Sequence, residues 1–144
     1  MKNNLLKAVY FVLNGLVMAV IVFLDAMEKH YGYPYPLPNG WLQPVLVLLS
    51  AVFAIVIPMW LRISAFSAYA KKDISASTEV FFRFELFTII SGWLAFAITP
   101  LAYVYAMNMW ARYLITFMAL YSLYYTYPWQ RKLMHDARLF KIKL

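Results

Sequence analysis

Four apolar stretches, each long enough to cross a lipid bilayer, run through a chain of only 144 residues. They lie at about residues 5–27, 41–63, 82–105 and 110–127. A helix of ~20 residues crosses the ~30 Å of hydrocarbon in a bilayer, so each stretch can span it. Backbone amides find no water there, and spanning segments are therefore helices or closed barrels. The sequence predicts an all-α membrane protein in which residues 1–128 form one bundle of four transmembrane helices.

The composition requires a bilayer as the solvent. Hydrophobic residues make up 65% of the chain and charged residues 13%. Soluble domains are about 45–50% apolar, and a small soluble domain leaves a large fraction of its surface exposed to water. The chain also has no cysteine, which excludes disulfides, thiolate nucleophiles and metal sites built from cysteine.

The basic residues gather on one side of the predicted bundle. If the N-terminus is cytoplasmic, eleven basic residues lie on the cytoplasmic side and two, Lys29 and Arg112, lie outside. The eleven are Lys2, Lys7, Arg62, Lys71, Lys72, Arg83, Arg131, Lys132, Arg138, Lys141 and Lys143. Because cytoplasmic loops carry an excess of Lys and Arg, we expect both termini in the cytoplasm. We also expect the protein in a bacterial-type inner (plasma) membrane.

Residues 129–144 form a basic tail after the last predicted span. On a helix, Leu133, Ala137 and Phe140 share one face, and basic residues occupy much of the remainder. This pattern is typical of an amphipathic helix that lies in the membrane interface. We expect its apolar face to enter the inner leaflet and its Lys and Arg side chains to bind anionic lipid.

Prolines and a cap predict where the helices bend, begin and end. Pro58 predicts a kink near the inner end of the second helix, and Pro100 predicts a bend in the outer third of the third. Pro128 predicts the end of the fourth helix. A serine or threonine within residues 75–78 is expected to cap the start of the third.

Small residues at four-residue spacing predict surfaces where helices pack. Ser91, Ala95 and Thr99 form one such stripe in the third helix, and Gly15 and Ala19 form a pair in the first. Residues four apart lie on the same helical face. Small side chains there let two membrane helices approach closely.

Two polar side chains fall near the middle of the predicted membrane. Asn14 either hydrogen-bonds to a neighbouring helix or contacts a solute. Trp93 lies far from the interfaces where tryptophan usually sits, so its indole N–H needs a partner or lines a cavity.

The outer loop is rich in tyrosine and proline. Tyr33, Tyr35 and Trp41 lie in or next to a segment whose alternating prolines favour an extended polyproline conformation. The loop either docks on a partner protein or lies among the lipid headgroups, where aromatic residues are common.

Arg62, Arg83 and Glu85 are expected at the same depth, near the inner surface. One interpretation is a structural cluster in which Glu85 pairs directly with Arg62 or Arg83. The alternative is a site for a lipid headgroup or another anion, with the two arginines holding a phosphate.

No pattern for catalysis, metal binding or cofactor binding is found. The two histidines, His30 and His135, are predicted on opposite sides of the membrane, so they do not form a joint site. No phosphate-binding loop is present. We therefore expect no catalytic residue, no metal and no cofactor, and nothing in the charge distribution requires nucleic acid.

The sequence favours a non-enzymatic accessory or partner subunit of a membrane complex that works through helix–helix contacts, with another membrane protein or further copies of itself as partner. An oligomeric transporter or channel for a small solute or ion is the first alternative. A lipid-handling enzyme at the inner leaflet is the second.

Reporter fusions test the predicted orientation. A reporter after Leu144 or within residues 71–77 should read cytoplasmic, and one within residues 33–40 should read exocytoplasmic. The reason is the unequal distribution of Lys and Arg between the two sides. A cytoplasmic signal from residues 33–40 would contradict the predicted topology.

Overall fold

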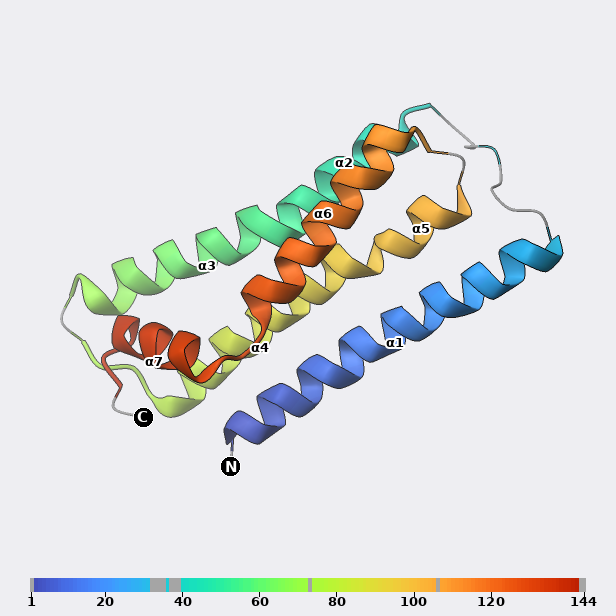
Figure 1. Ribbon diagram of the computed structural model, residues 1–144. Coiled ribbons are helices and arrows are strands. Elements are labelled where there is room, and N and C mark those ends of the chain that lie inside the picture. Colours follow the sequence, from blue (N-terminus) through green and yellow to red (C-terminus); the bar gives the residue numbers. More distant parts are fainter. Residues whose placement is uncertain (1, 32–35, 37–39, 73, 106, 143–144) are drawn as a thin grey trace.

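The computed structural model describes residues 2–31, 36, 40–72, 74–105 and 107–142, and over these residues it is helical without strands. Long helical segments lie side by side, and a short helix crosses one end (Figure 1). The elements are α1 (Lys2–Tyr31), α2 (Leu42–Ala51), η1 (Val52–Val56), α3 (Ile57–Ala65), η2 (Phe66–Ala70), α4 (Thr78–Ala97), α5 (Thr99–Val104), α6 (Met109–Thr126) and α7 (Gln130–Leu139).

Three helical segments are long and apolar enough to cross a membrane: Asn4–Met27, Leu42–Ala70 and Thr78–Val104. Helix α6 has 18 residues, but it is not among them. Its tyrosines and Arg112 make it more polar than the other three segments. The prediction of an all-helical protein with several apolar helices that could span a membrane is thus confirmed at this coarser level.

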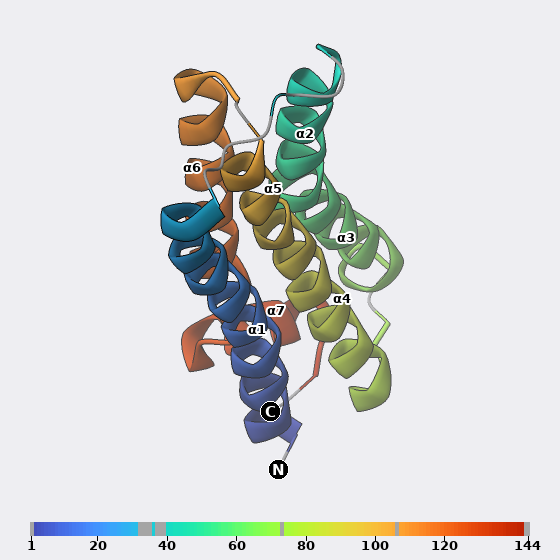
Figure 2. The same ribbon diagram turned by 90° about the vertical axis from the view of Figure 1, so that its right-hand side faces the viewer.

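The two ends of the bundle contain different parts of the chain. Both termini lie at the end where α7 crosses, together with the connection from η2 to α4 (Figures 1 and 2). The start of α2 and the connection from α5 to α6 lie at the opposite end (Figure 1). The chain therefore brings most of its basic residues to the end occupied by α7.

The second helical segment is longer than predicted. We expected it to end near residue 63, but it continues through η2 to Ala70. The residues after Ile63 include three alanines and no glycine or proline. Alanine has the highest helix propensity, so the helix extends beyond its most apolar part.

Pro58 shapes this segment together with Ser91 on α4. Within η1 the backbone is π-helical, and the N–H of Ile57 donates to the carbonyl of Val52, five residues earlier. The next bond in this register would run from residue 58 to the carbonyl of Phe53, but proline has no N–H. Ser91 Oγ donates to the Phe53 carbonyl oxygen instead, at 2.6 Å. A hydrogen bond between two segments thus takes the place of one within the helix.

The third segment follows the predicted local rules. Ser77 caps α4 by accepting a hydrogen bond from the N–H of Val80 at 3.3 Å. The α-helix breaks at Ile98, and Pro100 lies in the first turn of α5. Helix α6 ends at Thr126, because Tyr127 precedes Pro128 and is extended.

Helices α4 and α6 approach each other at Gly92. A Cβ atom added at Gly92 would lie 2.6 Å from Thr126 Oγ1, closer than side chains pack. Ser122 Oγ, one turn earlier on α6, shares its proton between the Ala119 carbonyl oxygen at 2.8 Å and the Gly92 carbonyl oxygen at 3.2 Å. The absence of a side chain at residue 92 thus sets the distance between these helices.

Helix α7 differs from the amphipathic surface helix that we predicted. Leu133, Ala137 and Phe140 share one face as expected, but this face packs on the protein rather than facing outward. The Phe140 ring lies 4.9 Å from the Phe84 ring and 5.6 Å from the Phe81 ring on α4, between centroids. The amphipathic pattern is the same for a helix on lipid and a helix on protein, so the sequence did not distinguish the two.

Replacing Gly92 tests the contact between α4 and α6. Gly92→Ala should lower the free energy of unfolding by about 1–3 kcal/mol, the usual cost of overpacking, because α6 must move to admit the methyl group. Gly15→Ala is the matched control, since nothing lies within 4 Å of a Cβ atom there. The control should leave stability unchanged or raise it by up to ~1 kcal/mol, since alanine favours helix. Equal effects in thermal unfolding in detergent would show that the close contact does not matter.

Candidate functional site

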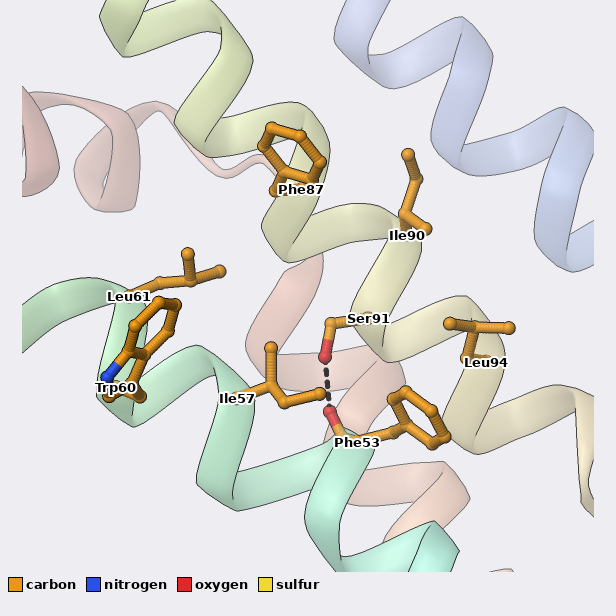
Figure 3. A pocket seen from close by; sticks show the side chains of 8 residues that line it. All are labelled: Phe53, Ile57, Trp60, Leu61, Phe87, Ile90, Ser91 and Leu94. Atoms are coloured by element: carbon orange, nitrogen blue, oxygen red, sulfur yellow. Dashed lines mark hydrogen bonds between the residues drawn. The ribbon is translucent and has the colours of Figure 1, made fainter.

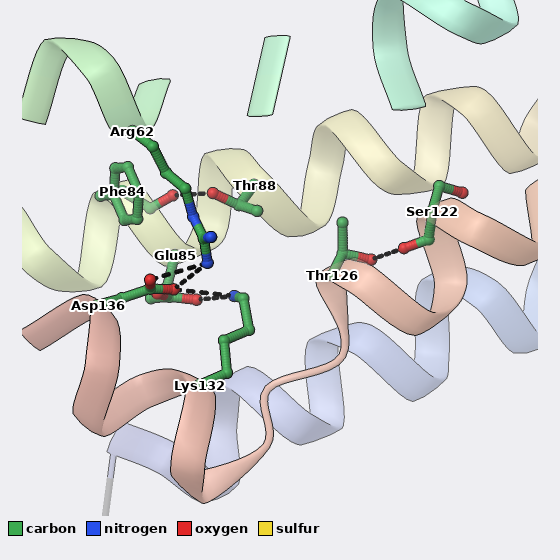
Figure 4. A network of polar contacts seen from close by, with 8 residues as sticks. All are labelled: Arg62, Phe84, Glu85, Thr88, Ser122, Thr126, Lys132 and Asp136. Carbon is green, nitrogen blue, oxygen red and sulfur yellow. Dashed lines mark hydrogen bonds and ion pairs between the residues drawn. The ribbon is translucent and has the colours of Figure 1, made fainter. Parts of the chain in front are cut away.

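Four charged side chains meet where α7 crosses the bundle (Figure 4). Arg62 donates to both carboxylate oxygens of Asp136, at 2.8 and 3.1 Å. Lys132 Nζ donates to Glu85 Oε2 at 2.6 Å and lies 3.5 Å from Asp136 Oδ2. We call these four residues the α7 charge cluster. Two positive and two negative charges make it neutral.

Helix geometry explains how the α7 charge cluster assembles. Lys132 and Asp136 are four residues apart on α7, so they share one face. Glu85 lies on the second turn of α4, and Arg62 lies near the end of α3. One face of a short helix thus ties two long segments together.

The α7 charge cluster is shielded from its surroundings. The side chains of Glu85 and Asp136 are fully buried, and those of Lys132 and Arg62 are 11% and 28% exposed. The Arg62 guanidinium also lies 4.8 Å from the centroid of the Tyr125 ring on α6. Buried charges are tolerated when they are paired and hydrogen-bonded. The geometry therefore favours a structural connection between helices.

The ion pairs differ from those expected for Arg62, Arg83 and Glu85. Arg62 and Glu85 belong to the same cluster, but each pairs with a residue of α7 rather than with the other. Arg83 is outside the cluster, because its side chain pairs with Glu79, one turn earlier on the exposed face of α4, at 2.6 Å. The two arginines are therefore not placed to hold one phosphate together.

Sequence reasoning missed Lys132 and Asp136. We treated Lys132 as one of several basic residues facing water or lipid. The available signal was Asp136, the one acidic residue in a basic tail, which stands one turn after Lys132. An acid among basic residues at that spacing indicates a face that meets charged groups of the protein.

The stripe of Ser91, Ala95 and Thr99 is buried inside the bundle. Ser91 makes the hydrogen bond to Phe53 described above, while the hydroxyl of Thr99 has no partner among the described residues. The stripe faces neighbouring helices, as a packing surface would.

Asn14 and Trp93 carry polar atoms without partners in the part of the chain that the structure describes. Asn14 Nδ2 donates to the Tyr10 carbonyl oxygen at 2.8 Å, but Oδ1 accepts nothing there. Trp93 Nε1 is buried and donates to no described residue, and the ring packs in an apolar cluster with Val17 and Phe96. Like the Thr99 hydroxyl, these atoms are buried polar groups that no described residue satisfies.

Gly15 and Ala19 lie on the outer side of α1 and are exposed. Among the described residues, α1 packs on α4 and α5 through its opposite side. After α1, Trp41 is exposed, whereas Tyr33 and Tyr35 of the predicted outer loop lie outside the described residues.

An apolar groove of about 370 Å³ opens between the second segment and α4 (Figure 3). Phe53, Ile57, Trp60 and Leu61 form one wall, and residues of α4 from Phe87 to Leu94 form the other. Its one hydroxyl, on Ser91, is already donated to a backbone carbonyl. The groove therefore offers apolar surface but no group for a reaction.

The described residues contain no group of three or more His, Cys, Asp or Glu side chains placed to hold a metal ion. In comparisons with protein-family models, curated proteins and solved structures, the chain matches none of them.

Removing one charge from the α7 charge cluster tests its structural role. Glu85→Gln should lower the free energy of unfolding by about 3 kcal/mol, because it breaks a buried pair and leaves the Lys132 ammonium undercompensated. Adding Lys132→Met should recover part of the loss, since the two residues are coupled.

Glu79→Gln is the matched control, because it removes the same charge from the same helix. The Glu79–Arg83 pair is exposed, and its loss should change stability by no more than ~1 kcal/mol. Thermal unfolding in detergent measures both variants. Equal losses for Glu85→Gln and Glu79→Gln would contradict a stabilising role for the cluster.

Proposed function

We propose that the protein is a non-enzymatic accessory subunit of a membrane complex and binds a transmembrane helix of another protein through the outer face of α1. The observation that carries this proposal is a row of small residues along that face. Ala8, Gly15, Ala19 and Ala26 are all exposed.

The four small residues share one side of the helix. At 3.6 residues per turn they fall within about 40° of one another. The buried side of α1, marked by Leu6 and Val17, lies opposite to them. The row therefore faces away from the side of α1 that packs on the other described helices.

Small side chains on an exposed helix face indicate contact with another helix rather than with lipid. Lipid tails are as apolar as leucine, so contact with lipid alone does not call for small side chains. Glycine and alanine expose a helix backbone and let a second helix come close enough for extensive van der Waals contact. Larger exposed residues such as Phe11 and Leu16 flank the row.

The arrangement of polar groups supports a role in binding rather than catalysis. The buried charges are paired with one another, and most of the buried hydroxyls donate to backbone carbonyls. A catalytic site would need a nucleophile and a base within reach of a substrate.

We further propose that α6 is the fourth span and that the end holding α7 faces the cytoplasm. Helix α6 lies against α4 and α2 along the bundle, so it has the position of a spanning helix. The concentration of Lys and Arg at the end with both termini supports this orientation in a bacterial-type inner membrane.

Site-specific crosslinking in native membranes tests the proposal. Since the chain has no cysteine, Ala19→Cys introduces a unique thiol that can carry a benzophenone label. After illumination, we expect a covalent adduct with one other membrane protein, identified by mass spectrometry, because the small-residue row holds a partner helix close.

Leu16→Cys is the matched control on the same helix, at an exposed position about 60–100° from the row. It should give much less adduct. Equal labelling at both positions, or an adduct only with a second copy of the chain, would contradict the proposed role as a subunit bound through this face.

A further inference from the structure

A second cavity, of about 600 Å³, lies where α6 ends and α7 begins. Tyr124, Trp129, Gln130, Arg131 and Lys132 line it. Its volume falls within the range of about 300–1,000 Å³ that is usual for small-molecule sites. It is separate from the apolar groove of Figure 3, and it shares one residue, Lys132, with the α7 charge cluster.

The polar groups that line this cavity mainly donate hydrogen bonds. Arginine, lysine and the tryptophan indole have no acceptor atom, and glutamine and tyrosine can also donate. No acidic side chain among the described residues lines the cavity. A ligand that fits this lining carries acceptor oxygens and negative charge.

The two cations of the cavity, Lys132 and Arg131, differ in whether neighbouring carboxylates balance their charge. Lys132 is committed to Glu85 and Asp136, so its charge is already balanced. Arg131 is exposed, and none of the ion pairs or side-chain hydrogen bonds among the described residues involves it. The cavity therefore has one unbalanced positive charge, on a side chain whose planar fork matches phosphate oxygens.

Two exposed aromatic rings at the cavity favour a position at the level of lipid headgroups. Tyr124 and Trp129 are 74% and 53% exposed. Such rings collect at the level of lipid headgroups, where one part of the side chain is apolar and the other is hydrated. They would contact the glycerol region of a lipid whose phosphate lies next to Arg131.

The geometry points to a binding site for the phosphate headgroup of an anionic phospholipid in the cavity between α6 and α7, with Arg131 as its main ligand. This site differs from the interfacial tail that the sequence predicted, because the apolar face of α7 is used within the protein. The lipid binds beside α7 rather than beneath it. The site is independent of the small-residue row on α1.

Lipid binding to the full-length protein in mild detergent tests the site, with native mass spectrometry to count bound lipids. Phosphatidylglycerol should bind more tightly than phosphatidylcholine. Arg131→Gln should weaken phosphatidylglycerol binding about fivefold, the effect of about 1 kcal/mol for one basic residue at an anionic surface. Arg131→Lys should restore part of the affinity, because it keeps the charge but loses the fork.

Arg138→Gln is the matched control, because it removes the same charge from an exposed position on the same helix, outside the cavity. It should leave the affinity unchanged. Equal weakening by the two variants would mean general attraction to the basic end and would overturn the site, as would no effect of Arg131→Gln. Unfolding midpoints without lipid confirm that both variants are folded.

A competition experiment separates a lipid headgroup from free phosphate. Millimolar inorganic phosphate should not displace phosphatidylglycerol, because the aromatic rings add contacts that the free ion lacks. Displacement by inorganic phosphate, together with equal binding of phosphatidylglycerol and phosphatidylcholine, would overturn the assignment to a lipid.

Discussion

The ion pair between Glu85 and Lys132 fixes where the last helix lies, and much of one end of the bundle depends on it. Helix α7 has only ten residues and a narrow apolar face. An apolar face of that size allows several orientations, since hydrophobic contact is not directional. A buried carboxylate allows few orientations of the helix, because its charge is either paired with a cation or left uncompensated. The α7 charge cluster therefore selects one orientation of α7, whatever its net contribution to stability.

Polar side chains along the bundle connect neighbouring helices through hydrogen bonds to backbone carbonyls. Several donate to a backbone carbonyl oxygen of another helix: the Tyr10 hydroxyl to Leu123, Ser91 to Phe53 and Ser122 to Gly92. In an apolar solvent a hydrophobic driving force between helices is absent, so such bonds and close packing hold helices together. Backbone carbonyls freed by proline or exposed beside glycine are available as acceptors. The irregular points of one helix thus become contact points for the next.

Much of the fold follows from the sequence, and the parts that do not are those decided by tertiary contacts. The apolar stretches, the cap at Ser77 and the helix end before Pro128 depend on local rules, so they could be read from the chain. The partners of Arg62 and Glu85 could not, because proximity in predicted depth does not reveal which helix faces which. The packing of Phe140 could not be predicted either, since the same amphipathic pattern suits a helix that lies on lipid and a helix that packs on protein. The outward position of Gly15 required knowing which side of α1 the bundle uses.

The π-helical turn at Val52–Val56 has a consequence for the residues that follow it. A π-turn contains one residue more than the α-helix would use, so everything beyond it is rotated by about 100° around the helix axis. Arg62 comes six residues after η1 and points toward Asp136 in this rotated frame. The turn acts as a phase shift between the two halves of the segment. Its first half presents Phe53 to α4, and its second half presents Arg62 to α7. A chain lacking one residue between Val52 and Val56 would keep its apolar character and lose that alignment.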